Sequence, residues 1–189
     1  MKTYLFPALR LTFVLILLFS GVYPLLVLGV AQLLPGGGKG GLVKNKGVVV
    51  GYENIGQKFS GDAYFWSRPS AVDYNAAGSG GSNKGPSNPE YLATVQARVD
   101  SFLVHNPGIT IDQVPADLVT ASGSGLDPDI SVESAKVQVP RIARIRKINE
   151  DRLYQLIDEV KEKPLLGFLG PEKINVLQLN IALEQLPQQ

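Results

Sequence analysis

The residue types that could carry catalysis are scarce in this chain. The sequence has one histidine, His105, and no cysteine, which excludes thiolate nucleophiles, disulfides and cysteine-based metal sites. A serine nucleophile needs a base that takes up its proton. Residues 122–125 (SGSG) come nearest to a nucleophile elbow, but Ser122 stands where the G-x-S-x-G pattern requires glycine. We therefore do not expect this protein to be a hydrolase. We interpret His105 as a residue at the C-terminal end of a helix.

Acidic and glycine-rich segments raise the questions of a metal site and a phosphate-binding loop. Asp127 and Asp129 flank Pro128, and carboxylates at this spacing could bind a hard cation. We favour a turn in which the Asp127 side chain caps the backbone. Residues 78–85 (GSGGSNKG) lack the G-x-x-x-x-G-K-[ST] motif, because Gly85 replaces the final serine or threonine. The sequence therefore shows no site for hydrolysing ATP.

A short basic cluster lies in a segment with helical character. Its members are Arg141, Arg144, Arg146 and Lys147. We interpret the cluster as a solvated helix face, and the alternative is a surface that pairs with acidic residues of a partner.

The elements that position these residues begin with an apolar segment near the N-terminus. Residues 11–34 contain no charged side chain. A helix over them is roughly 36 Å long, enough to cross a hydrocarbon core of about 30 Å. Because the segment is longer than the apolar core of a signal peptide, we expect a retained helix that spans the lipid bilayer. We expect Pro24 to kink it, and Gly21, Pro24 and Gly29 to let a partner helix approach closely.

The distribution of charge leaves the orientation of this helix open. Two basic residues precede it, and three lysines follow it before the first acid, Glu53. All 17 acidic residues and all but two of the 18 basic residues follow the helix, so that part of the chain is nearly neutral. That balance argues against a nucleic-acid-binding domain.

The remaining chain reads as one α+β domain, with strands early and helices late. We expect a short N-terminus over residues 1–10, a Gly-rich linker and turn over residues 35–47, and a soluble domain over residues 48–189. Short strands are predicted at 42–43 and 48–50, and Tyr64-Phe65-Trp66 is predicted to be a third. Residues 75–89 form a long loop that is either functional or disordered.

Helices are predicted to follow this loop. Asn88, Ser131 and Asn149 are suited to capping the first turns of three of them. Pro140 is expected to kink or split the second, and residues 174–186 are predicted to form a last helix.

A series of short sequence motifs indicates a known family. They occur in one order along almost the whole chain: residues 21–25 (GVYPL), 55–57 (IGQ), 68–71 (RPSA), 79–83 (SGGSN), 87–89 (SNP), 118–122 (LVTAS), 124–127 (SGLD), 138 with 140–143 (Q and PRIA), and 175–176, 179–180 and 182–183 (NV, LN and AL). Together they resemble the C subunit of the bacterial Kdp-type potassium-transporting P-type ATPase.

This resemblance implies a non-catalytic accessory subunit of an ATP-driven, high-affinity potassium uptake complex. The implied partners are a potassium-channel-like subunit, a P-type ATPase subunit and a very small membrane subunit. The family is single-pass in the bacterial cytoplasmic (inner) membrane, with its N-terminus inside and its main domain outside. It is needed for assembly, and it has been proposed to raise the ATPase subunit's affinity for ATP. A domain outside the membrane cannot touch cytoplasmic ATP, so that effect would act through the complex.

We expect partner contacts or functional loops among residues carried by these phrases. The candidates are Arg68, Pro69, Ser79, Gly80, Gly81, Ser82, Asn83, Ser122, Ser124, Gly125, Leu126, Asp127, Gln138 and Arg141. No catalytic residue, metal site or tightly bound cofactor is expected. One alternative is a nucleotide-binding regulator, since Ser79-Gly80-Gly81 is similar to part of an ABC-transporter signature. Another is a domain that guides cations through Glu53, Asp62, Asp73, Asp117 and Asp127, although its near-zero net charge disfavours a strong field.

Overall fold

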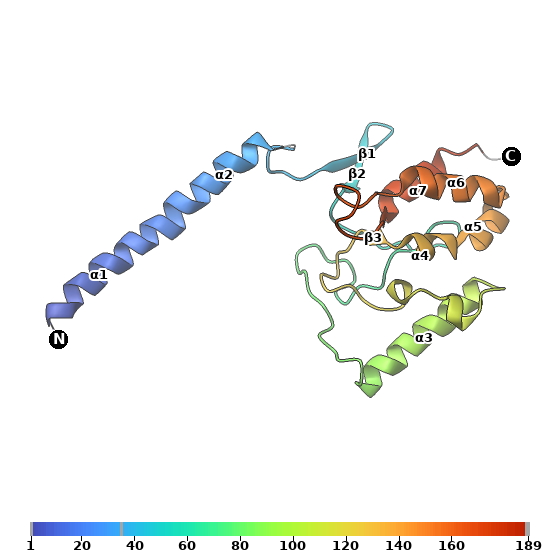
Figure 1. The fold of residues 1–189 in the computed structure, drawn as a ribbon, viewed down its shortest axis with the longest axis horizontal. Coiled ribbons are helices and arrows are strands. Elements are labelled where there is room, and N and C mark those ends of the chain that lie inside the picture. The colour runs from blue at the N-terminus through green and yellow to red at the C-terminus, as the bar shows by residue number, and fades with distance from the viewer. Residues whose placement is uncertain (1, 35, 188–189) are drawn as a thin grey trace. The chain divides into compact units, whose positions relative to one another are not determined.

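The computed structural model describes residues 2–34 and 36–187, and the chain divides into two compact units that meet between Leu42 and Val43 (Figure 1). The first unit is built around a long N-terminal helix. The second holds both small sheets and all the remaining helices.

The N-terminal helix consists of α1 (Lys2–Leu17), a π-helical turn (Leu18–Val22) and α2 (Tyr23–Leu33). Its stretch from Tyr4 to Leu33 is long and apolar enough to cross a membrane, and none of it is buried. Pro24, where we expected a kink, lies in the first turn of α2 directly after the π-helical turn. Because proline has no N–H to donate and its ring crowds the preceding turn, a locally wider turn lets the helix continue.

The second unit begins with two strands, as predicted. β1 (Leu42–Asn45) pairs with β2 (Val48–Tyr52) in a two-stranded sheet. The turn between them is Lys46-Gly47, and both residues have positive φ, 49° and 83°. Two-residue hairpin turns favour that conformation because its twist matches that of the strands.

The predicted strand at Tyr64–Trp66 is wrong, because no strand in the described part of the chain pairs with this segment. Two buried side-chain amides take the place of a strand. Asn180 accepts from Phe65 N at 2.9 Å and donates to Phe65 O at 3.0 Å, and Gln138 accepts from Trp66 N at 2.7 Å. The apolar pattern therefore indicated burial of Phe65 correctly, but not the pairing of the backbone.

The helices begin where the capping residues predicted. Asn88 caps α3 (Pro89–His105), Ser131 caps α4 (Val132–Lys136), and Asn149 caps α6 (Glu150–Val160). Pro140 splits the second predicted helix, so that α5 (Val139–Arg146) follows α4 as a separate helix. The last predicted helix is shorter than expected, because Ile174-Asn175 forms β4, paired with β3 (Asp129–Ile130), before α7 (Val176–Glu184). Two short 3-10 turns, Ile111–Gln113 and Ala116–Leu118, lie between α3 and β3.

One hydrophobic core lies among α4, α5, α6 and α7, which pack together in Figure 1. It buries Phe65, Ile130, Val132, Ala135, Val139, Ile142, Ala143, Ile148, Leu153, Leu156, Ile157, Ile174, Val176, Leu179 and Leu183. α3 stands apart and is attached by a smaller contact, in which the Phe102 ring meets the Trp66 ring edge-on at 6.1 Å. The architecture is α+β, with strands early and helices later, as predicted.

Candidate docking surface: a loop cluster and the α3 cleft

The structure brings several predicted docking residues together in a cluster of three loops, residues 68–74, 79–81 and 122–127, which we call the loop cluster. Gly80 N and Ser79 Oγ both donate to Ser124 O, at 2.8 and 2.9 Å. Ser70 Oγ donates to Gly125 O at 2.7 Å. Segments separated by more than 40 residues are thus held together by hydrogen bonds to the backbone.

Glycine is required where these loops approach each other most closely. Gly125 has φ +68°, and a Cβ there would lie 2.7 Å from Gly80 O and from a methyl group of Val72. A Cβ on Gly81 would lie 3.0 Å from Gly123 O. Gly81 and Gly125 therefore have a packing role that short sequence motifs do not reveal.

The predicted residues in the loop cluster and next to it differ in their exposure to solvent. Ser79, Ser82, Asn83 and Ser124 are exposed, whereas Ser122 and Gly125 are buried. Ser122 Oγ accepts from Gly125 N at 2.9 Å, an internal turn contact. The exposed members are those that could meet a partner protein, and the buried ones hold the loops in place.

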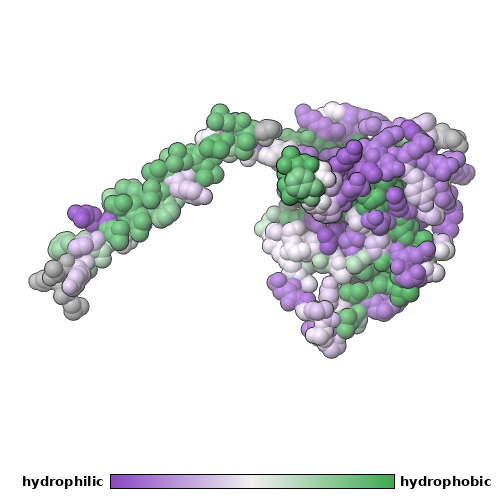
Figure 2. Space-filling view, in the orientation of Figure 1, coloured by the Kyte–Doolittle hydropathy of each residue, from purple (hydrophilic) through white to green (hydrophobic). Residues whose placement is uncertain are grey.

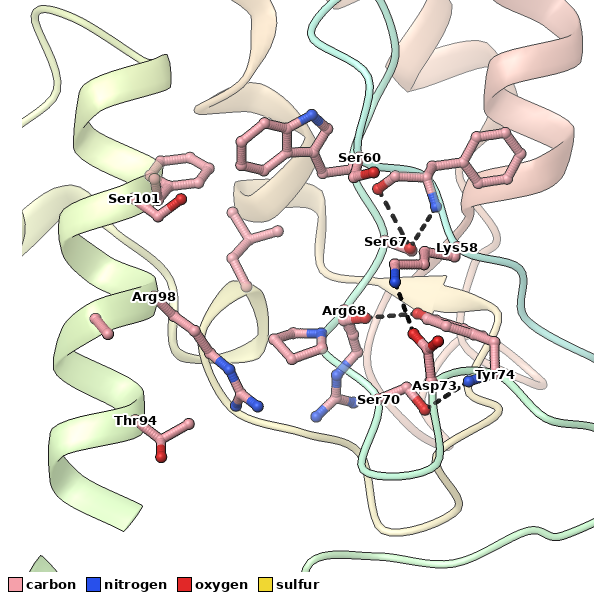
Figure 3. Close-up of a pocket in the computed structure, with 16 residues that line it drawn as sticks. Lys58, Ser60, Ser67, Arg68, Ser70, Asp73, Tyr74, Thr94, Arg98 and Ser101 are labelled. Carbon is pink, nitrogen blue, oxygen red and sulfur yellow. Dashed lines mark hydrogen bonds and ion pairs between the residues drawn. The ribbon is translucent and has the colours of Figure 1, made fainter. Parts of the chain in front are cut away.

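A cleft of about 470 Å³ lies between α3 and residues 58–74, and we call it the α3 cleft (Figure 3). Arg98, from α3, and Arg68 extend into the same part of it (Figure 3). Arg98 Nη1 donates to Val119 O at 3.0 Å, and Arg68 Nη1 pairs with Asp127 Oδ2 at 2.6 Å. Within the described part of the chain, the buried Nε of Arg68 has no hydrogen-bond partner.

Neutral groups complete the cleft. Ser60, Ser67, Thr94 and Ser101 line it together with the rings of Trp66 and Phe102. Tyr74 Oη donates to Arg68 O at 2.5 Å, and burial raises the pKa of this phenol, which keeps it neutral. Lys58 is paired with Asp73 at 2.7 Å in an exposed position. A cleft lined by two guanidinium groups and several hydroxyls suits a carboxylate or phosphate group.

Gln138 and Arg141 do not belong to this surface. They are 0% and 2% exposed, and their side chains bind inside the domain. Arg141 donates to Asn106 Oδ1 at 2.9 Å, to Gln138 Oε1 at 2.7 Å and to Tyr64 O at 3.1 Å. Burial lowers the pKa of Arg141 to about 10, which leaves it charged at neutral pH. A buried arginine of this kind is structural.

The prediction of a solvated basic face is therefore wrong for half of the cluster. Arg144 and Lys147 are exposed, but Arg141 is buried, and the Arg146 side chain is only 9% exposed. Arg146 donates to Ala63 O at 2.6 Å and pairs with Glu184 at 2.5 Å. The reason is the missing strand: the carbonyls of residues 62–64 need donors, and the two arginines of α5 supply them.

The acidic residues take the turn that we favoured. Asp127 Oδ1 accepts from Asp129 N at 3.1 Å, while its other oxygen is paired with Arg68. Asp117 accepts from Ser131 N at 2.8 Å and from Ser134 Oγ at 2.6 Å. Across residues 2–34 and 36–187, no group of three potential ligands is arranged to hold a metal ion.

His105 is the last residue of α3, as expected. Its Nδ1 lies 2.9 Å from Asp62, and its ring meets Trp66 edge-on at 5.0 Å. Asp62 and Asp73, two of the acids considered for guiding cations, are thus paired with His105 and Lys58. Asp117 binds the first turn of α4, and Asp127 caps a turn. These contacts leave those four acids little freedom to act on a passing cation.

Arg98 is the residue of the α3 cleft that our sequence reasoning missed. It lies on α3 three residues after Val95 and four residues before Phe102, so the three side chains share one face of the helix. An arginine within an apolar helix face is a sequence signal of a polar partner there.

In the other unit, a Cβ on Gly21 or Gly29 would find nothing within 4 Å, so both positions offer the helix a smooth surface.

These features define a class: a membrane-length apolar helix joined to a small α+β domain whose exposed features suit binding. Comparison with known families identifies the particular one. The family model described as "KdpC: K+-transporting ATPase, c chain" matches residues 5–185. The chain belongs to this KdpC family, which confirms the resemblance seen in its sequence.

Individual relatives are similar in sequence to this chain over nearly their whole length. A potassium-transporting ATPase KdpC subunit of Flavobacterium psychrophilum is 53% identical over 182 residues, covering 96% of this chain and 98% of the relative. The KdpC subunit of Bacteroides thetaiotaomicron is 51% identical, covering 98% and 99%. That of Geobacter sulfurreducens is 50% identical, covering 95% and 96%.

Proposed function

We propose that this chain is a non-catalytic accessory subunit of an ATP-driven potassium uptake complex, needed for the complex to assemble. The observation that carries the proposal is the match over residues 5–185 to the c chain of K+-transporting ATPases. The structure is consistent with it. The chain's single histidine is engaged with Asp62 and Trp66 and is not among the residues that line the α3 cleft.

The proposed topology is a single pass through the bacterial cytoplasmic membrane. Residues 1–10 lie inside, residues 11–34 span the bilayer, residues 35–47 form the linker and turn, and residues 48–189 lie outside. The partners are a potassium-channel-like subunit, the P-type ATPase subunit and a very small membrane subunit. The smooth positions Gly21 and Gly29, with Pro24 between them, are proposed to face a helix of one of these partners.

The loop cluster and the α3 cleft form the proposed docking surface. Its exposed polar residues, Ser79, Ser82, Asn83 and Ser124, are suited to hydrogen bonds across an interface. Arg68 and Arg98 are suited to receive an acidic side chain of a partner.

An influence on the ATPase subunit's affinity for ATP would act through the assembled complex. Gly80 N and the Ser79 hydroxyl, which a nucleotide-binding loop would use, both donate to Ser124 O. We therefore expect calorimetry with millimolar ATP to give no binding heat for the purified chain. Clear saturable heat would favour the nucleotide-binding regulator over this proposal.

Affinity purification from the native membranes tests the proposal. The tagged full-length chain is extracted in mild detergent after growth at low potassium. We expect a P-type ATPase and a channel-like subunit to accompany it in fixed proportion, with potassium-stimulated ATPase activity. A chain that is extracted alone under gentle conditions would contradict a role as a subunit.

Two matched variants locate the docking surface. Arg98→Gln removes a cation from the α3 cleft, whereas Arg152→Gln removes an exposed arginine from α6. We expect the first to reduce recovery of the partner subunits and the second to leave it unchanged. Deletion of residues 78–85 should likewise reduce recovery while the domain stays folded. Unchanged recovery with Arg98→Gln and with the deletion would exclude this surface.

A further inference from the structure

An exposed apolar loop joins α6 to β4, and our sequence reasoning did not single it out. Residues 164–171 (PLLGFLGP) contain no charge, and we call them the apolar tip. Leu165, Leu166 and Phe168 are 70%, 76% and 74% exposed, and Leu169 is 49% exposed. In Figure 2 hydrophobic residues (green) gather over the loop that precedes β4, among hydrophilic neighbours. The surface of a soluble protein seldom exposes so many large apolar side chains next to one another.

The turn at the end of the tip is not built from the residues that suit it best. Leu166 and Gly167 have φ values of 56° and 83°. Such a turn favours asparagine, aspartate or glycine at both positions, because a side chain like leucine is strained at positive φ. Leu166 therefore keeps an apolar side chain at the most exposed point at the expense of local conformational stability.

Several backbone groups of the tip, mainly N–H groups, are paired within the tip. Leu165 and Leu169 exchange two hydrogen bonds, at 3.0 and 2.9 Å, and Gly167 N donates to Pro164 O at 2.9 Å. These bonds reduce the number of backbone groups that would lose water in an apolar medium. The tip can enter such a medium without refolding.

The root of the tip lies close to the point where the membrane tether joins the domain. Glu162 and Lys173 pair across the root, and two residues later Asn175 Nδ2 donates to Glu53 O, directly after β2, at 2.8 Å. The tether is short as well: from Leu34 to Leu42 the chain can span at most about 29 Å. A tether of this length lets the tip reach a bilayer that contains the N-terminal helix.

The charged residues that flank the apolar tip, residues 161–163 and 172–173, are compatible with a lipid surface. Lys163 is exposed beside the tip and takes part in none of the ion pairs found among the described residues. Lysine next to exposed leucine and phenylalanine is the composition that favours the interface of an anionic bilayer.

We propose that the apolar tip inserts into the interface of the bilayer in which the N-terminal helix is embedded, as a second membrane contact that restricts the domain. The proposal rests on the membrane anchor of the proposed function, but it does not depend on which side the domain occupies. The convex shape of a loop end, together with the short tether, favours a lipid surface over a protein pocket. Tethering raises the local concentration of the bilayer, so a few apolar side chains suffice.

Site-specific fluorescence quenching tests this contact. The chain has no cysteine, so a single introduced cysteine carries one environment-sensitive label. Labels are placed at Leu166→Cys in the tip, at Leu26→Cys in the N-terminal helix and at Ala93→Cys on exposed α3. The full chain is placed in nanodiscs of phosphatidylethanolamine and phosphatidylglycerol, with and without lipids that carry a nitroxide on the acyl chain.

We expect lipid nitroxides to quench the labels at 26 and 166, and quenching at 166 to exceed that at 93 at least about twofold. Phe168→Asp should reduce quenching at 166 to the level seen at 93. Val104→Asp, which introduces the same charge at a similarly exposed apolar residue of α3, should not change it.

The contrary outcomes are separable. Quenching at 26 without quenching at 166 would overturn the tip contact and leave the membrane anchor standing. No quenching at 26 would overturn the anchor and with it the premise of the tip contact. In the purified complex, a label at 166 that is protected from aqueous iodide but not quenched by lipid would show a protein partner covering the tip, which also overturns the proposal.

Discussion

At the scale of single residues, this domain depends on polar side chains that replace a strand. Gln138, Arg141 and Asn180 are all nearly inaccessible to solvent, and all three bind the backbone of residues 62–66. Backbone groups buried without partners destabilise a fold, so each of these side chains satisfies a requirement that a neighbouring strand would otherwise meet. Family membership alone does not show whether these three side chains bind a partner or stabilise the fold.

Replacing Arg141 by methionine is expected to destabilise the domain by about 3–5 kcal/mol, because acceptors at Asp62, Tyr64, Asn106 and Gln138 lose a buried charged donor. Urea unfolding followed by circular dichroism measures the change. Arg144→Met, on the exposed side of the same helix, is the control and should stay within about 0.5 kcal/mol of the natural chain. Equal effects of the two substitutions would contradict a structural role for Arg141.

The Arg146–Glu184 pair should make stability depend on pH. The hydrogen bond from Arg146 lowers the pKa of Glu184, so its contribution is present above the ordinary carboxyl pKa and disappears as pH falls through the lowered value. Glu184→Gln should therefore cost about 0.5–1 kcal/mol at pH 7, since the pair is partly solvated, and nothing at strongly acidic pH. Unfolding midpoints across pH 2–7 measure the difference. Glu53→Gln is the control, and a difference that does not vary with pH would refute this assignment.

At the scale of elements, the sequence predicted where helices begin better than how strands pair. Asn88, Ser131 and Asn149 act within one turn, so their meaning is local, and each caps a helix as expected. Tyr64–Trp66 depends on partners more than 70 residues away, and no local pattern distinguishes a strand from a segment bound by side-chain amides. The same limit explains the basic cluster, because only the fold shows that Arg141 faces inwards.

The loop cluster offers a matched pair of glycines. Gly125→Ala should separate the 79–81 and 122–127 loops, because the new Cβ would meet Gly80 O at 2.7 Å on a backbone with φ +68°. Gly123→Ala adds the same methyl group where nothing lies within 4 Å and φ is not positive. We expect the first variant to recover less of the partner subunits than the second, with both domains folded by circular dichroism. Equal recovery would show that the arrangement of these loops is irrelevant to docking.

At the scale of the whole molecule, the two units divide membrane attachment from folding. All residues of the core cluster lie between Phe65 and Leu183, and none of the apolar side chains of the N-terminal helix is buried. This division was visible in the sequence, where residues 11–34 lack charge and every acid follows them. The proposed docking surface was only partly visible, because Arg98 belongs to none of the motifs that indicated the family, and the apolar tip lies outside those motifs as well.

The division predicts that residues 43–189 fold without the rest of the chain. The truncated domain should keep its near-ultraviolet circular dichroism and unfold in one transition, within about 4 °C of the full chain in detergent, because it loses no buried contact of its core. It should also fail to fractionate stably with membranes and to co-purify with partner subunits, since a docking surface without the anchoring helix loses the advantage of a shared bilayer. A domain that unfolds on truncation would show that the N-terminal unit contributes to its stability. A truncated domain that still assembles with the partners at full yield would show instead that the docking surface alone determines membership of the complex.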